Sequence, residues 1–133
     1  MNIWLQLLLV FLSGGFGACC RHLISLALKP TGLWLGFATW VINSSGCLLM
    51  GIFAGMVVAS DWSNETRIAW TMLLMTGFCG GYSTFSAFTL DCVKYFESGH
   101  LGIWIIFGLA TIFVGLFACA LGYWFGKHLM TGF

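Results

Sequence analysis

The chain alternates long apolar stretches with short polar turns. Residues 1–20, 30–60, 68–90 and 95–126 contain no aspartate, glutamate, lysine or arginine, apart from Glu97. A helix needs about 20 mostly apolar residues to cross the hydrocarbon core of a bilayer. The pattern therefore predicts four transmembrane helices, over residues 3–28, 33–59, 67–95 and 101–126.

These four helices use nearly the whole length and leave no room for a soluble domain. Hydrophobic residues make up 60% of the chain and charged residues 7%, whereas soluble proteins carry about 25% charged residues. The expected fold class is an all-α membrane protein with one domain, residues 1–133. We expect it in the cell (inner) membrane as a multi-pass protein, in contact with lipid and not with nucleic acid.

The distribution of basic residues favours neither orientation of the chain in the membrane strongly. Cytoplasmic loops normally carry an excess of lysine and arginine. Here one side of the membrane receives Arg67 and Lys127, and the other receives Arg21, Lys29 and Lys94. Because the difference is a single charge, the chain is expected to insert both ways and pair as an antiparallel, dual-topology homodimer, much as inverted repeats pair within some transporters.

The third predicted helix contains the glycine-rich run GFCGGYSTFSAF at residues 77–88. Glycine inside a helix costs about 1 kcal/mol relative to alanine, and a broken helix in lipid requires protein or water to satisfy the freed backbone groups. The run predicts a break whose carbonyls could coordinate a cation at membrane depth. The alternative is close packing of an intact glycine-rich helix.

Two phenylalanines follow this run. Phe85 and Phe88 are three residues apart and share a helix face. Since an aromatic ring has a positive edge, two such edges beside a narrow path could stabilise a small dehydrated anion without a full charge that would trap it. Alternatively, both rings are ordinary core or lipid-facing side chains.

Polar side chains at membrane depth offer further candidates. Asn43 lies inside the second helix, where an amide is costly unless it is hydrogen-bonded, and it offers two N–H donors to an anion. Thr39, one turn earlier, could extend this polar track. Arg21 could supply positive potential at a vestibule. Interhelical hydrogen bonds and, for Arg21, snorkelling to the interface are the alternatives.

Small residues mark possible helix contacts. Gly51 and Gly55 form a GxxxG pattern, and Gly108, Gly115 and Gly122 repeat every seven residues along one stripe of the last helix. Such patterns let helix backbones approach closely. The contacts could lie within one protomer or between two.

The residues give no indication of an enzyme. The six cysteines lie in apolar runs without a C-x-x-C pair, the three histidines lie near helix ends, and no serine or cysteine can be matched with a histidine and a carboxylate. A small multidrug exporter of four helices remains the main alternative, although proton-coupled export requires an intramembrane carboxylate, which the first helix lacks. A haem or quinone anchor would require histidines at membrane depth.

Taken together, these residues resemble the Fluc/CrcB family of small membrane fluoride channels. The family pattern has GG-x-G-x-x-x-R, then N-x-x-G, then GxCGG followed by STFSTF. This chain reads GGFGACCR at 14–21, NSSG at 43–46 and GFCGGYSTFSAF at 77–88. The order and spacing of all three motifs agree with the family.

The resemblance implies passive fluoride efflux that relieves fluoride toxicity, through two antiparallel pores in a homodimer. It also implies a structural sodium ion at the centre, held by the backbone carbonyls of Gly80 and Ser83. Phe85 and Phe88 would supply the aromatic pair, and Asn43 a pore donor. Arg21 would match the family arginine at the vestibule.

The chain departs from the family pattern at several positions. Tyr82 replaces a leucine and Ala87 a threonine, and the polar track of the last helix reads Thr111, Gly115 and Cys119. Thr111 is therefore expected to contact the anion, whereas Gly115 removes one contact of the track.

Overall fold

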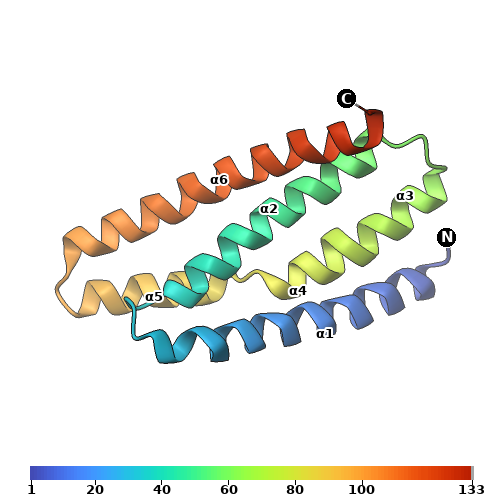
Figure 1. The fold of residues 1–133 in the computed structure, drawn as a ribbon. Helices are drawn as coiled ribbons and strands as arrows, with labels where there is room; N and C mark the ends of the chain where they lie inside the picture. The colour runs from blue at the N-terminus through green and yellow to red at the C-terminus, as the bar shows by residue number, and fades with distance from the viewer. Residues whose placement is uncertain (133) are drawn as a thin grey trace.

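Helices make up nearly all of the computed structural model, which describes residues 1–132 (Figure 1). Three of them are long: α1 (Ile3–Leu28), α2 (Phe37–Ala59) and α6 (Leu101–Thr131). The polypeptide between α2 and α6 forms shorter segments, namely α3 (Asn64–Trp70), the π-helix η2 (Thr71–Cys79), α4 (Gly80–Tyr82) and α5 (Phe85–Glu97). A single 3₁₀ turn, η1 (Lys29–Thr31), follows α1.

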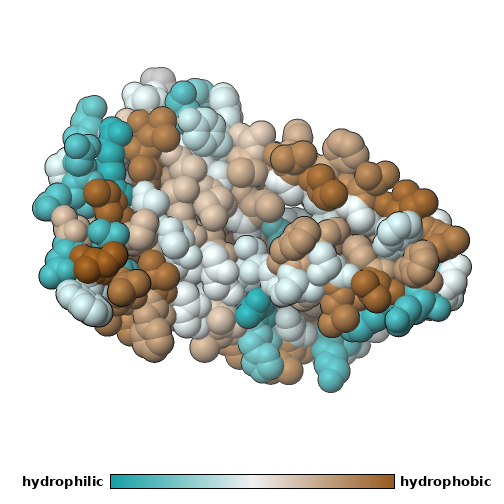
Figure 2. All heavy atoms as spheres, turned by 180° about the vertical axis from the view of Figure 1, so that it is seen from behind, coloured by the Kyte–Doolittle hydropathy of each residue, from teal (hydrophilic) through white to brown (hydrophobic). Residues whose placement is uncertain are grey.

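The all-α prediction is confirmed, and within residues 1–132 three helices are long and apolar enough to cross a membrane: Ile3–Thr31, Phe37–Ala59 and Leu101–Thr131. Figure 2 shows apolar side chains over much of one face of the molecule, while hydrophilic ones lie at the end drawn on the left and along the lower edge. The second helix begins four residues later than the sequence predicts, because Gly36, at φ +81°, adopts a left-handed conformation directly before it.

The third predicted helix consists of two parts. Residues 64–82 are continuously helical, and α5 begins at Phe85. Between them, Ser83 (φ −82°, ψ 158°) and Thr84 (φ −148°, ψ 113°) have extended backbones. Thr84 caps α5, because its hydroxyl oxygen accepts a hydrogen bond from the N–H of Ala87 at 3.2 Å. The non-helical residues thus follow the glycines rather than include them.

Two of the glycines before this point pack against α1. A Cβ atom on Gly77 would overlap the Ser13 hydroxyl, and one on Gly81 would overlap the carbonyl of Gly14. Gly80 points elsewhere, since a Cβ there would come no closer than 3.9 Å to another group. Gly77 and Gly81 therefore allow close packing of this helix against α1, which was the alternative to a break at the glycines.

The glycines of α2 and α6 serve the contact between these two helices inside one protomer. A Cβ on Gly51 would overlap the carbonyl of Cys119, and one on Gly55 would overlap the carbonyl of Tyr123. Gly122 approaches the backbone of α2 in the same way. The small residues therefore bring α2 and α6 into backbone contact, which positions the side chains between them.

We expect Gly55→Ala to lower the midpoint of thermal unfolding in detergent, because overpacking a close contact costs about 1–3 kcal/mol. Gly108→Ala is the matched control, since a Cβ at Gly108 would meet nothing within 4 Å. This control should unfold at the wild-type temperature or slightly above it, because alanine favours the helix. Equal midpoints for the two variants would contradict the proposed backbone contact.

Candidate functional site

Asn43 on α2 holds the non-helical segment from the side. The backbone N–H of Thr84 donates to Asn43 Oδ1 at 2.8 Å, and Asn43 Nδ2 donates to the Thr84 carbonyl at 3.0 Å. The interhelical hydrogen bonds considered from the sequence are thus present, and they satisfy both backbone groups of Thr84 at membrane depth. A primary amide has two N–H groups, so one donor of Asn43 is not needed for this pair.

A cavity of about 400 Å³, here called the Asn43 cavity, lies beside this pair, between α2, α5 and α6. Its wall includes four of the residues that the sequence indicates as anion contacts: Asn43, Phe85, Phe88 and Thr111. Ser83 and Gly115 also line it. Residues from three separate stretches of the sequence therefore meet at one place.

The two phenylalanines of this cavity have different surroundings. Their ring centroids lie 5.7 Å apart at an interplanar angle of 49°. Phe88 is buried, with 8% exposure, and lies 5.7 Å from the ring of Phe107. Phe85 is 76% exposed on the surface of the protomer. Phe88 is therefore fixed by packing, whereas Phe85 projects from the protomer.

Thr111 is buried on α6, and its hydroxyl donates to the carbonyl of Phe107 at 2.7 Å. A hydroxyl has one hydrogen to donate, so Thr111 presents oxygen lone pairs to the cavity in this conformation. Contact with an anion would require rotation of the hydroxyl hydrogen away from the helix backbone.

A second cavity, of about 250 Å³, lies on the other side of the non-helical segment. Arg21 and Thr39 line it, and Thr84 contributes to the walls of both cavities. The structure thus separates Arg21 and Thr39 from the phenylalanine pair, with Thr84 between the two groups. Thr84 is a site residue that the sequence analysis did not indicate. A threonine at the start of TFSA is typical of a helix N-cap, and this pattern could have identified it.

Thr39 does not point freely into this second cavity. Its hydroxyl donates to Asp91 Oδ2 at 2.7 Å, and the other carboxylate oxygen lies 3.6 Å from Lys94 Nζ. Asp91 is buried, with 8% exposure. Thr39 and Lys94 therefore hold this carboxylate between α2 and α5.

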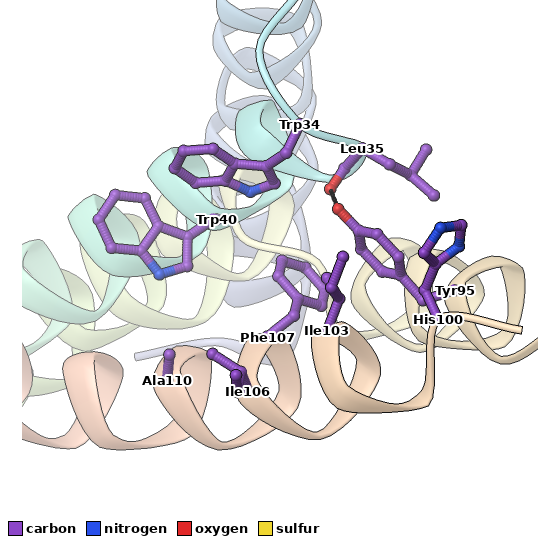
Figure 3. A pocket seen from close by; sticks show the side chains of 9 residues that line it. All are labelled: Trp34, Leu35, Trp40, Tyr95, His100, Ile103, Ile106, Phe107 and Ala110. Atoms are coloured by element: carbon purple, nitrogen blue, oxygen red, sulfur yellow. Dashed lines mark hydrogen bonds between the residues drawn. The ribbon is translucent and has the colours of Figure 1, made fainter.

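A larger cavity, of about 600 Å³, lies apart from these groups (Figure 3). Trp34 and Trp40 face Phe107 and Ile103 of α6 across it, and the Tyr95 hydroxyl donates to the Leu35 carbonyl at one side at 2.6 Å. It shares no lining residue with the Asn43 cavity. We place the candidate anion site at the Asn43 cavity, because four of the residues that the sequence indicates as anion contacts line that cavity and none of them lines this one.

Comparison with known proteins decides between the three classes of membrane protein that the sequence left open. The family model described as "CrcB-like protein, Camphor Resistance (CrcB)" matches residues 8–123. The chain belongs to the CrcB family. The resemblance stated from the motifs is confirmed, and a multidrug exporter or a haem anchor is no longer needed to explain the chain. As a CrcB-family chain with several apolar spanning helices, it is a multi-pass membrane protein.

Curated relatives cover most of this CrcB-family chain. It is 37% identical over 115 residues to the fluoride-specific ion channel FluC 2 of Nitrobacter hamburgensis, covering 84% of this chain and 90% of the relative. It is 42% identical to FluC of Rhodopseudomonas palustris strain BisB5, with the same coverage. With FluC of Mesorhizobium japonicum it shares 36% identity over 125 residues, which are 93% of this chain and 98% of the relative.

Tyr82, a departure from the family pattern, has a defined place in this CrcB-family structure. It is buried, its hydroxyl lies 2.8 Å from the Ser45 hydroxyl of α2, and its ring stacks on Phe78 with centroids 5.7 Å apart. The phenol thus adds a polar link between α4 and α2 next to the non-helical segment.

Proposed function

We propose that this CrcB-family chain is a fluoride-selective channel that lets fluoride leave the cell passively and so relieves fluoride toxicity. The names of its relatives support this function. The observation that carries it is the single cavity lined by Asn43, Phe85, Phe88 and Thr111. Fluoride efflux from liposomes that contain the purified protein is the direct test.

The chemistry of the cavity suits a small, tightly hydrated anion. Such an ion leaves water only where donors and positive edges replace its hydration shell, and they must hold it weakly enough for release. The second N–H of Asn43 supplies a donor, and the edges of Phe85 and Phe88 supply partial positive charge. Arg21, in the neighbouring cavity, adds a full positive charge outside the narrow region and draws anions towards it.

We further propose that the functional unit is an antiparallel homodimer with two such pores. The near balance of basic residues on the two sides of the membrane supports this arrangement. So does the 76% exposure of Phe85, which leaves the ring available to a second protomer. In this arrangement the interrupted third helix makes the fourth membrane crossing, since the two parts together contain residues 64–97.

Dual topology predicts that a single reporter cysteine is accessible from both sides of the membrane. Placed at exposed Asn64 in a cysteine-free background, it should be labelled in about equal fractions by impermeant reagent added outside and inside, because the charge bias is weak. A fixed-topology membrane protein in the same vesicles is the control. Labelling from one side alone would contradict the antiparallel dimer.

The proposed structural sodium ion requires backbone carbonyls without helical partners. In a continuous helix, the carbonyl of Gly80 would accept the N–H of Thr84, and that of Ser83 would accept the N–H of Ala87. The first N–H donates to Asn43 instead and the second to the Thr84 hydroxyl. Both carbonyls are thus available, and such oxygens suit an alkali cation.

We expect an experimental structure of the dimer to contain density on the two-fold axis with short contacts to the carbonyls of Gly80 and Ser83 from both protomers. Sodium should be required to maintain the dimer, because the dimer would otherwise bury these carbonyls without a donor. A dimer equally stable in sodium-free buffer, without this density, would rule out the sodium site.

A further inference from the structure

Gly115 breaks the polar track of α6 at the Asn43 cavity, and a side chain from α2 lies opposite it. The track has Thr111, Gly115 and Cys119 at one-turn spacing. A Cβ built on Gly115 would meet one neighbour within 4 Å, the Sγ atom of Cys47, at 3.2 Å. The thiol of Cys47 therefore occupies the space in which a side chain at Gly115 would lie.

Cys47 also belongs to the same cavity as the proposed anion contacts. It lines the wall together with Asn43, Gly115 and Cys119. It follows Asn43 by four residues on α2, so both side chains lie on one face of the helix, one turn apart. A thiol is a weak S–H donor, and it continues the row of donors that begins at Asn43.

We propose that the Cys47 thiol supplies from α2 the anion contact that Gly115 cannot supply from α6. This inference rests on the proposed fluoride channel and adds a residue to its pathway. An anion moving along the cavity would pass from the Asn43 amide to the Cys47 thiol, with Thr111 and Cys119 on the facing helix. Cys47 and Gly115 act as a complementary pair, one providing the polar group and the other the room for it.

The competing view is that Cys47 is a small apolar residue that fills the contact between α2 and α6. Substitutions separate the two roles. Serine keeps a donor of nearly the same size, valine keeps the volume without a donor, and alanine removes both. A packing role predicts that valine is the best tolerated of the three, whereas a donor role predicts serine.

We expect Cys47→Ser to conduct fluoride within about twofold of wild type in liposome efflux, and Cys47→Ala and Cys47→Val to lose about fivefold, as for the loss of one weak hydrogen bond. Adding Gly115→Ser to Cys47→Ala should restore most of the rate, because the new hydroxyl enters the space left by the thiol. The same Gly115→Ser change in the wild-type background should slow efflux, because its Cβ lies 3.2 Å from Sγ. Cys20→Ala, on α1 and outside this cavity, is the control and should conduct like wild type.

Each variant must elute as the wild-type species in size-exclusion chromatography, and if Cys47→Ala does not fold, the serine and valine variants decide. The inference is overturned if Cys47→Ala and Cys47→Val conduct like wild type, if serine is as impaired as valine, or if Gly115→Ser fails to rescue a folded Cys47→Ala. In these cases the wild type still conducts fluoride and the proposed function stands. A wild-type protein that passes no fluoride would overturn the proposed function itself.

Discussion

Asn43→Asp is expected to reduce the initial rate of fluoride efflux from liposomes by about a hundredfold. The substitution keeps the size of the side chain but removes the donor to the Thr84 carbonyl, which Asn43 contacts at 3.0 Å. A carboxylate would face that carbonyl and repel the anion at the same time. A lost partner and an unfavourable charge together cost on the order of 3 kcal/mol, which accounts for this loss.

Two further variants separate the charge from the lost hydrogen bond. Asn43→Ala removes both hydrogen bonds to the Thr84 backbone but introduces no charge, so faster efflux in this variant than in Asn43→Asp would assign most of the loss to the charge. Asn64→Asp makes the same chemical change at an exposed residue at the start of α3 and should conduct normally. If Asn43→Asp conducts at the wild-type rate, Asn43 is not in the anion path.

Phe85→Ile is expected to reduce fluoride efflux at least about tenfold with little effect on protomer stability, because isoleucine keeps an apolar side chain but has no positive ring edge. Phe88→Ile should have an equal effect on efflux and should also lower the free energy of unfolding by about 1–2 kcal/mol. The reason for the difference is packing, since Phe88 lies buried against Phe107 while Phe85 is 76% exposed.

Phe11→Ile is the matched control for the exposed ring, because Phe11 on α1 is 75% exposed and lies outside the Asn43 cavity. Its efflux should equal that of wild type. The dimer should persist in the Phe85 variant, as measured by cross-linking in the membrane. Unchanged efflux in both Phe85→Ile and Phe88→Ile would remove the aromatic pair from the pathway.

The membrane-spanning architecture could be predicted because it depends on local composition. Apolar length and the absence of charge are properties of each segment alone, and the predicted first helix agrees with α1 at both ends. The predicted start of α2 was too early because Gly36 has a left-handed backbone and lies close to the Phe107 ring of α6. This contact joins segments far apart in the sequence, so the local residue pattern does not indicate it.

The position of the non-helical segment could not be read from the glycines, because glycine favours both a break and a close helix contact. Contacts with α1 decide the matter for Gly77 and Gly81. The extended residues are Ser83 and Thr84, where the Asn43 amide supplies the partners that a helix would otherwise supply. The π-helical geometry of Thr71–Cys79 likewise has no signal in the residue pattern.

The sequence predicts most of the residues of the candidate site but not their hydrogen bonds. Asn43, Phe85, Phe88 and Thr111 were indicated as anion contacts and all line one cavity, whereas Thr39, indicated with them, lies outside it and donates to Asp91. Their hydrogen bonds depend on tertiary structure. The sequence did not indicate that Asn43 also binds the Thr84 backbone, nor that Thr111 donates to its own helix.

Fluoride and chloride efflux from the same preparation of liposomes tests the central claim most directly. Liposomes loaded with both anions and containing the purified protein are diluted into buffer without halide, and ion-selective electrodes record each anion while a potassium ionophore compensates charge. The proposed function predicts rapid fluoride release and chloride release no faster than from protein-free liposomes. Absence of protein-dependent fluoride release, or equal release of the two anions, would contradict it.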